Sequence, residues 1–145
     1  MILSENRKAR HDYQILKCFE AGLVLLGSEV KSIRQRKVQL RDSYIAEKRG
    51  ELYWYKGHID QYQASSYNNH EPDRPRKLLL HKSEIHDILG ALEKKGQTCV
   101  PLKIYLKNGK IKMEIALVRG KTHSDKRQDD AKKSARREME RALKR

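Results

Sequence analysis

Long apolar runs and cysteines are scarce in this 145-residue chain, and each scarcity excludes a class of protein. The longest apolar stretch covers residues 21–27, far short of the roughly 20 residues that a membrane-spanning helix needs. Cys18 and Cys99 are the two cysteines, with no CxxC pair and no secretory leader before them. We therefore expect no membrane contact and a cytoplasmic protein whose thiols are reduced and packed as apolar side chains.

The sequence also lacks the motifs of common catalytic sites. It has no GxxxxGK[ST], no GxSxG and no HExxH, and residues 22–27 lack the glycine spacing of a dinucleotide-binding turn. The six histidines do not have the spacing of a structural zinc site. His11 and Asp12 are adjacent, but neighbours on a strand point to opposite faces, so we interpret them as surface residues. An enzyme, a metal site and a bound cofactor are therefore not expected.

Positive charge is abundant and unevenly distributed. Residues 119–145 hold 11 Lys/Arg against 5 Asp/Glu, a net charge of +6, while the preceding 118 residues carry a net charge of +8. The hydrophobic content of the first part suits one compact domain. We expect a domain at residues 1–120, a basic tail at residues 121–145, and a polyanion as partner, with RNA the first choice.

Alternating apolar residues predict an antiparallel β-protein. The clearest pattern is a hairpin over residues 100–117, in which Asn108-Gly109 supplies a type I′ turn. Further strand patterns cover residues 13–26, a hairpin over 44–59, and 76–80. Short strands joined by hairpin turns are typical of an antiparallel barrel.

Two segments have helical patterns. Ser83 can cap a helix whose apolar residues follow helical spacing, and Gly96 is placed to end it, so one face should pack on the barrel. Residues 28–35 form a shorter helical pattern. Residues 64–75 are polar and contain two prolines, which predicts a mobile surface loop. The fold class is therefore α+β and mainly β, with helices packed on the barrel.

In the tail, Ala131, Ala135 and Met139 recur at helical spacing among lysines and arginines. This stripe buries little apolar surface, helix nucleation is costly, and the cations repel one another. We expect a tail that is disordered when free and becomes helical against a polyanion.

Basic residues near aromatic ones indicate RNA contacts. The basic cluster at residues 6–11 precedes Tyr13, so it can contact phosphates and stack on a base, although a solvated terminus has the same composition. Tyr53-Trp54-Tyr55 fits either a stacking platform or core packing. Alternation turns at least one of the three inward, and Trp54 is the expected core residue.

Four motifs, in this order and spacing, resemble those of one known family. They are NRKARHDY at residues 6–13, FEAGL and GSEVKSIR at 19–34, RKLLLHK at 76–82, and RGK followed by DKR at 119–127. Over essentially its whole length, the chain resembles the small protein B family, the SsrA-binding proteins of bacterial trans-translation. The resemblance implies an oligonucleotide-binding-type barrel without enzymatic activity. It also implies binding of the tRNA-like domain of transfer-messenger RNA (SsrA) and its delivery to stalled ribosomes, which rescues them and tags the nascent peptide for degradation.

The resemblance implies two binding regions. One barrel face is expected to bind transfer-messenger RNA, and the tail is expected to enter the decoding centre and the vacant mRNA channel of the 70S ribosome. The candidate RNA-binding residues are Asn6, Arg7, Lys8, Tyr13, Glu20, Leu79, His81 and Lys112. The candidate ribosome-binding residues are His123, Asp125, Lys126, Arg127, Lys132, Lys133, Arg136 and Arg137.

Several of these assignments leave alternatives open. Asn6 is either an RNA contact or part of a frayed terminus, and Lys112 is either an RNA contact or an outward hairpin residue. Leu79 alternates within a strand and is either a core residue or an RNA contact. Glu20 repels phosphate, so it can help by accepting hydrogen bonds from base or 2′-OH donors or by positioning a cation such as Lys112. Ser124 stands where the family commonly has an aromatic residue or histidine, so either His123 takes that stacking role or the contact is missing.

The resemblance further implies a bacterial cytoplasmic protein that meets elongation factor Tu and alanyl-tRNA synthetase through the RNA. The main alternative is a ribosomal structural protein whose basic tail threads into ribosomal RNA. That alternative explains the charge but not the four motifs together, and it predicts permanent association with the ribosome. An RNA-processing enzyme is a third possibility, which the missing acid–base cluster disfavours.

Overall fold

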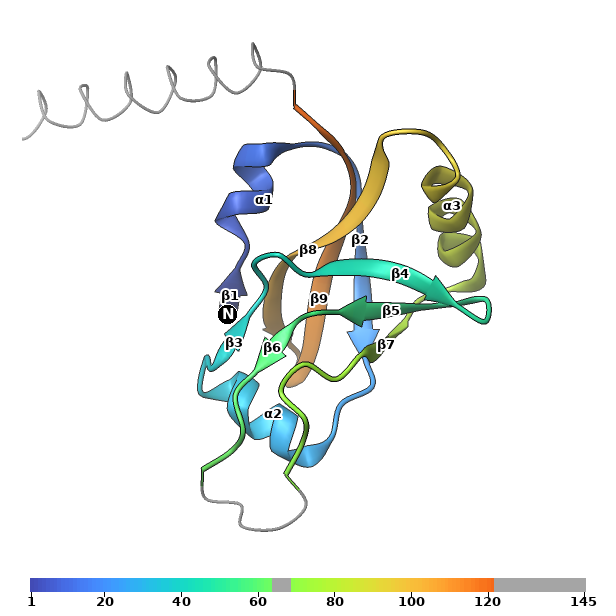
Figure 1. Cartoon of the computed structure of the whole chain (residues 1–145). Coiled ribbons are helices and arrows are strands. Elements are labelled where there is room, and N and C mark those ends of the chain that lie inside the picture. The colour runs from blue at the N-terminus through green and yellow to red at the C-terminus, as the bar shows by residue number, and fades with distance from the viewer. Residues whose placement is uncertain (64–68, 122–145) are drawn as a thin grey trace, which may run out of the picture.

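The computed structural model describes residues 1–63 and 69–121 of the chain (Figure 1). The predicted basic tail, except Lys121, and residues 64–68 of the predicted loop lie outside the described residues. The described residues form three helices and nine strands. In chain order these are β1 (Ile2–Glu5), α1 (Arg7–Asp12), β2 (Tyr13–Leu23), α2 (Gly27–Arg34), β3 (Val38–Gln39), β4 (Tyr44–Lys48), β5 (Glu51–Tyr55), β6 (His58–Ile59), β7 (Arg76–Leu79), α3 (Lys82–Leu92), β8 (Gln97–Lys107) and β9 (Lys110–Gly120).

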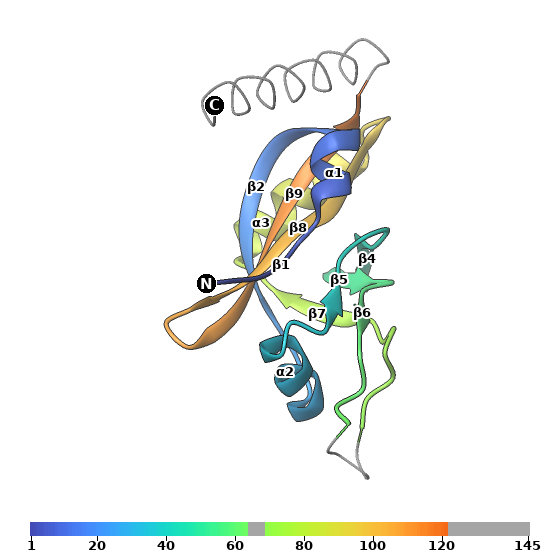
Figure 2. The ribbon, with the colours of Figure 1, turned by 90° about the vertical axis from the view of Figure 1, so that its left-hand side faces the viewer.

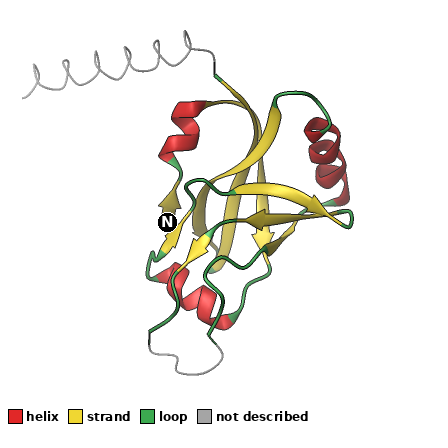
Figure 3. Ribbon diagram, in the orientation of Figure 1, coloured by secondary structure: helices red, strands yellow, loops and turns green. Residues whose placement is uncertain are grey.

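The described strands build a large antiparallel sheet and a short two-stranded one (Figure 3). The large sheet has the order β1-β8-β4-β5-β7-β2-β9, and β9 pairs again with β8, so the sheet closes into a barrel. Closure is possible because β4 pairs near the start of β8, at Cys99, whereas β1 pairs near its end, at residues 103–105. β3 pairs with β6 in the second sheet. The predicted α+β class with an antiparallel barrel is confirmed.

The hairpin predicted over residues 100–117 is present, and the one predicted over residues 44–59 is present over residues 44–55, because residues 58–59 pair with β3 instead. In the β8–β9 turn, Asn108 and Gly109 have φ angles of 52° and 75°, and two positive values in succession define the expected type I′ turn. In the β4–β5 turn, Arg49 and Gly50 have φ angles of 54° and 78°. These turns fix the register of each hairpin and therefore the face on which each side chain lies.

Two bulges let the long strands curve around the barrel. The β2–β9 register shifts between Ile15 and Lys17, and the β8–β9 register shifts between Pro101 and Lys103. An extra residue in one strand bends it and increases its twist. Pro101 has no N–H to donate, so the irregular stretch is the part of β8 that tolerates it.

Trp54 lies in the core, as predicted, and is fully buried. Its indole Nε1–H donates to Ser43 Oγ at 2.8 Å, which satisfies the polar end of the ring. Gly57 lies against the same ring, because a Cβ built on it would be 1.9 Å from Trp54 Cζ2. The ring therefore occupies the space that any larger residue at position 57 would need.

The two cysteines differ. Cys99 is fully buried, as expected, and burial raises the pKa of its thiol to about 12. Cys18 is exposed, so the expectation that both thiols are packed is wrong for this residue. Neighbouring residues on a strand point to opposite faces, and Phe19 on β2 faces the core. Cys18 beside it therefore faces solvent.

The helices surround the barrel, with α1 and α2 at opposite ends (Figures 1 and 2). In α3, Ile88 is fully buried and its apolar neighbours pack against the core, as predicted. The expected ends were wrong: the helix is capped at His81, whose N–H donates to Glu84 Oε1 at 3.0 Å, and it ends at Leu92. Gly96 instead has a φ angle of 83° in the turn that leads into β8.

The helix at residues 28–35 was predicted within one residue of α2, but α1 was not predicted. Asn6 caps α1, because its Oδ1 accepts from the Ala9 N–H at 3.2 Å. No described helix is long and apolar enough to cross a membrane.

Candidate nucleic-acid interface

A surface hollow of about 490 Å³ lies where β2, β7 and β9 meet the start of α3. Four of the eight candidate RNA-binding residues line it together: Glu20, Leu79, His81 and Lys112. A second hollow of about 400 Å³ adjoins it and shares Gly22, Leu79 and Lys112 with it. We call these two depressions the paired hollow.

Strand register explains how distant residues meet there. Gly22 on β2 lies opposite Leu79 on β7 and, on its other side, opposite Lys112 on β9. Residues directly opposite in an antiparallel pair lie on the same face of the sheet. A Cβ on Gly22 would be 3.2 Å from Leu79 Cβ and 3.7 Å from Lys112 Nζ. The missing side chain at Gly22 therefore lets the leucine and the lysine approach each other.

Leu79 is 53% exposed, so of its two predicted placements the core is wrong. Leu78 beside it points inward and is 1% exposed. Strand alternation thus places one leucine in the core and the next in the centre of the paired hollow. An exposed leucine in that position provides apolar contact area to whatever binds there.

Cations surround Leu79. Lys77, Lys82 and Lys112 line the first hollow, and within residues 1–63 and 69–121 none has a carboxylate within 4.0 Å. The second hollow adds Arg34 and Lys110, and no acidic residue lines it. Three carboxylates line the first hollow, of which Glu84 is engaged with the His81 N–H. The paired hollow therefore offers free ammonium groups next to an apolar centre.

Glu20, the second carboxylate of the hollow, is held by two residues of β8. The Tyr105 hydroxyl donates to Oε2 at 2.5 Å, and Lys107 Nζ lies 3.2 Å from Oε1. The hydrogen bond from Tyr105, followed by that from Lys107, lowers the pKa of Glu20 from its ordinary value. The ion-pair partner of Glu20 is therefore Lys107, not the predicted Lys112.

Tyr105 and Lys107 were missed by the sequence reasoning, although a signal for them existed. A two-residue turn at residues 108–109 pairs Lys107 with Lys110 and Tyr105 with Lys112. Continuing that register across β9 to β2 brings both residues to the face that holds Glu20. The predicted hairpin thus contained the neighbours of Glu20.

The other candidate residues lie elsewhere on the barrel. Tyr13 precedes Glu20 by seven residues on β2, a separation of about 23 Å for an extended strand. A cavity of about 250 Å³ near Tyr13 is lined by Asn6 and Lys8 as well. The predicted RNA face is therefore divided between the two ends of β2 (Figure 2).

The Asn6 side chain is buried and hydrogen-bonded within the fold. It is 4% exposed, and besides capping α1 its Nδ2 donates to Pro101 O at 2.9 Å and to Leu40 O at 3.4 Å. Arg7 is exposed, with its Nε 3.8 Å from Glu5 Oε2. Lys8 Nζ donates to Asp42 Oδ1 at 2.8 Å. Both polar atoms of the Asn6 side chain are thus used, to cap α1 and to join its start to β8 and to the segment between β3 and β4.

The tyrosines beside Trp54 face away from the core. Tyr55 stacks on Tyr44 with ring centres 5.7 Å apart, and the Tyr53 ring centre lies 6.3 Å from that of Tyr55. Trp54 is buried and therefore unavailable for stacking on RNA, and the accessible part of the predicted platform consists of the two half-buried tyrosines.

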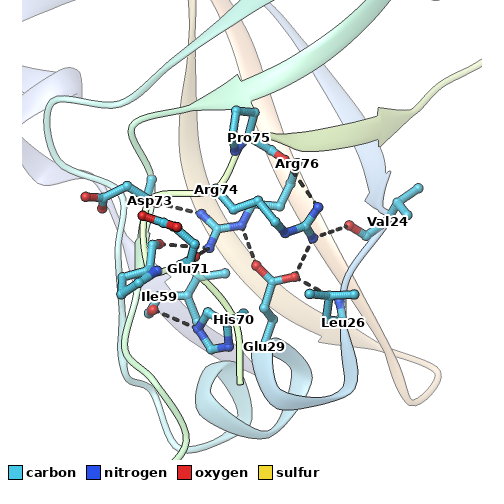
Figure 4. Close-up of polar contacts among 12 residues, drawn as sticks. Val24, Leu26, Glu29, Ile59, His70, Glu71, Asp73, Arg74, Pro75 and Arg76 are labelled. Atoms are coloured by element: carbon cyan, nitrogen blue, oxygen red, sulfur yellow. Dashed lines mark hydrogen bonds and ion pairs between the residues drawn. The ribbon is translucent and has the colours of Figure 1, made fainter. Parts of the chain in front are cut away.

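A buried ion pair joins α2 to β7 (Figure 4). Arg76 Nε donates to Glu29 Oε2 at 2.6 Å, and both side chains have no exposed surface. Arg74 Nη2 and the Leu26 N–H donate to Glu29 Oε1 at 2.5 and 2.8 Å. Sequence reasoning missed this pair, although Glu29 precedes the buried Ile33 by four residues and so lies on the same helical face.

The guanidinium of Arg76 is engaged on its other side as well. Nη1 donates to Gly57 O at 2.6 Å, and Nη2 donates to Pro72 O at 2.8 Å. Burial alone raises the pKa of Glu29, but the hydrogen bonds from Arg74, Leu26 and Arg76 outweigh it, so the pKa is lowered. The ionised pair fixes the start of β7 relative to α2, and both elements form walls of the paired hollow.

Within the described residues, no group of three histidine, cysteine, aspartate or glutamate side chains is placed to hold a metal ion. The eight candidate ribosome-binding residues, from His123 to Arg137, lie outside the described residues, as does Ser124.

The fold and the surface together define a class of protein: a small antiparallel β-barrel with peripheral helices and a cation-lined hollow on its outer face. The family model described as "SmpB protein" matches residues 3–145. The chain therefore belongs to the SmpB family, and the predicted family is confirmed.

Relatives and a solved structure agree with this membership. An SsrA-binding protein of Bdellovibrio bacteriovorus is 58% identical over 128 residues, which cover 88% of this chain and 84% of that protein. An SsrA-binding protein of Thermosynechococcus vestitus is 53% identical over 144 residues, covering 99% and 95%. A solved structure described as "tmRNA-SmpB: a journey to the center of the bacterial ribosome" has a TM-score of 0.70 and 50% identity, covering 83% of this chain and 85% of that one.

Proposed function

We propose that this chain is a non-catalytic adaptor that binds the tRNA-like domain of transfer-messenger RNA and delivers it to stalled ribosomes. The observation that supports the RNA-binding role is the paired hollow, where free cations surround the exposed Leu79. Ammonium groups neutralise phosphates, and an apolar side chain between them contacts a sugar or base. The names of the SsrA-binding relatives support the choice of RNA.

Salt dependence of binding tests whether the paired hollow is used. Lys112→Ala should weaken binding to the tRNA-like domain and lower the slope of log K against log salt by about one unit. Lys95→Ala removes the same charge from an exposed residue that lines neither hollow, and it should leave the slope unchanged. Equal effects of the two substitutions would argue against the hollow as the binding site.

We further propose that the tail, residues 121–145, binds the decoding centre and the empty mRNA channel and becomes helical there. Its charge supports an anionic partner of this kind. In the full chain, replacing Asp125, Lys126 and Arg127 by alanine should abolish ribosome rescue and peptide tagging while leaving RNA affinity nearly unchanged. Elongation factor Tu and alanyl-tRNA synthetase would then meet the chain through the bound RNA.

A ribosomal structural protein makes a different prediction. It would remain on ribosomes in a one-to-one ratio whether or not transfer-messenger RNA is present. Quantifying the chain on ribosomes from cells with and without that RNA separates the two roles, and the adaptor should leave the ribosome fraction when the RNA is removed.

A further inference from the structure

We propose that Tyr105 and Lys107 are positioning residues that hold the Glu20 carboxylate as a fixed acceptor for N–H or 2′-OH donors of the bound RNA. The inference rests on the proposed function. It states that the edge of the paired hollow at Glu20 selects hydrogen-bond donors of the RNA. In this arrangement Glu20 contributes to the choice of RNA, whereas the free lysines contribute mainly to the strength of binding.

The carboxylate reaches across a whole strand. Glu20 lies on β2, its holding residues Tyr105 and Lys107 lie on β8, and β9 runs between them. A flexible glutamate side chain that spans a strand needs fixed partners at its end, and a hydroxyl and an ammonium supply them. The result is an ionised group whose position is set before any ligand arrives.

The held carboxylate still has capacity to accept. An ionised carboxylate has about four acceptor positions. Tyr105 uses one on Oε2, and the Lys107 ammonium lies 3.2 and 3.3 Å from the two oxygens. The Glu20 side chain remains 40% exposed, so a donor from outside can reach it.

The negative charge of the Glu20 carboxylate indicates the chemical class of that donor. A phosphate is repelled by the carboxylate, so the group that binds must carry hydrogen: an amino group on a base edge or a ribose 2′-OH. The same ion pair withdraws Lys107 from phosphate contact, while Lys112 on the neighbouring strand has no carboxylate within 4.0 Å among the described residues. Phosphate binding and donor selection are thus assigned to adjacent positions on the surface.

Tyr105→Phe isolates the positioning role because it removes one hydroxyl and no charge. We would measure the affinity of the full-length chain for the tRNA-like domain and for an unrelated RNA of equal length. The variant should lose about tenfold in affinity for the tRNA-like domain, in line with the loss of a hydrogen bond to a charged group, and should keep its affinity for the unrelated RNA. Tyr53→Phe is the matched control, since no hydrogen bond of its hydroxyl is present among the described residues, and it should change neither affinity.

Glu20→Gln should act in a different way. It releases Lys107, so binding of the unrelated RNA should become tighter and its salt slope should steepen by about one unit, while the preference for the tRNA-like domain falls. Combining Glu20→Gln with Tyr105→Phe should lower that preference no further than Glu20→Gln alone, because the hydroxyl acts through the carboxylate. Lys107→Arg keeps the ion pair and should retain the preference.

The probes distinguish the two sources of donor. If 2′-deoxy substitution in the tRNA-like domain removes the effect of Glu20→Gln, the donor is a 2′-OH; if inosine in place of guanine does so, it is a base amino group. Equal losses for both RNAs in Tyr105→Phe would overturn the inference. A wild-type chain without preference for the tRNA-like domain would instead refute the proposed function itself. A preference that depends on Leu79 and Lys112 but not on Tyr105 would leave the function standing and refute only this inference.

Discussion

Arg76 and Glu29 form an ion pair without exposed surface, with Nε and Oε2 2.6 Å apart, and they join the first residue of β7 to the first turn of α2. Both residues occur in motifs that carry the family resemblance. The pair therefore links two segments that the sequence shows only as separate motifs, and it fixes two walls of the paired hollow.

Breaking this pair should be costly. Arg76→Met leaves the Glu29 carboxylate buried with one charged partner fewer, and such losses cost about 3–5 kcal/mol of the free energy of unfolding. Urea denaturation measures the difference. Arg41→Met is the control, because Arg41 is exposed, 3.7 Å from Asp42, and exposed pairs contribute little. Equal midpoints for Arg76→Met and the wild type would contradict a structural role of the pair.

The Arg76–Glu29 pair should also make the free energy of unfolding decrease as the pH falls into the acid range. The pKa of Glu29 in the folded chain lies below its ordinary value of 4.5, so its stabilisation is present above that pH and is lost as the pH falls through the folded-state pKa. The difference in unfolding free energy between the wild type and Glu29→Gln should be constant near neutrality and narrow below about pH 4.5. A difference that stays constant into acid would show that folding does not lower the pKa of Glu29.

Gly57 and Gly90 should respond in opposite ways to alanine. Gly57→Ala places a Cβ 1.9 Å from Trp54, and overpacking of this kind costs about 1–3 kcal/mol. Gly90 lies within α3 with no atom within 4 Å of a Cβ, so Gly90→Ala should stabilise by about 0.5–1 kcal/mol. Fluorescence of the single tryptophan follows both unfolding transitions. Stabilisation by Gly57→Ala would contradict the packing of Trp54.

Gly22→Ala should affect RNA binding more than stability. The added Cβ meets Leu79 at 3.2 Å and must displace a side chain that faces the paired hollow. Affinity for the tRNA-like domain should fall several-fold, with little change in the unfolding midpoint. Gly27→Ala, which meets no atom within 4 Å, is the control and should change neither quantity.

The sequence predicted those features that depend on local pattern. The hairpin turn at residues 108–109, the buried Trp54 and the apolar face of α3 all follow from alternation, turn chemistry and helical spacing, and all are confirmed. The position of Leu79 was left open because an isolated strand does not show which of its faces meets the core. Residues 78 and 79 are both leucine, so alternation alone gave two answers.

Long-range polar contacts were not predictable in the same way. Glu29 and Arg76 are 47 residues apart, and nothing local in either segment indicates the other. α1 was missed because its six residues are almost all polar and Asn6 is the main signal of its start. The division of the candidate RNA-binding residues between the two ends of β2 was not drawn from the sequence, although the predicted strand at residues 13–26 already separates Tyr13 from Glu20 by seven residues.

The most direct test of the central claim compares the full-length wild type with the double variant Leu79→Ala/Lys112→Ala at physiological salt. Each is measured for binding to the tRNA-like domain of transfer-messenger RNA and to an unrelated RNA of equal length. The double variant Leu16→Ala/Lys95→Ala is the control, since both residues are exposed and line neither hollow. We predict tight binding of the tRNA-like domain by the wild type and the control, and a large loss of that affinity in Leu79→Ala/Lys112→Ala. Full affinity for the tRNA-like domain in that variant would contradict the paired hollow as the RNA-binding site.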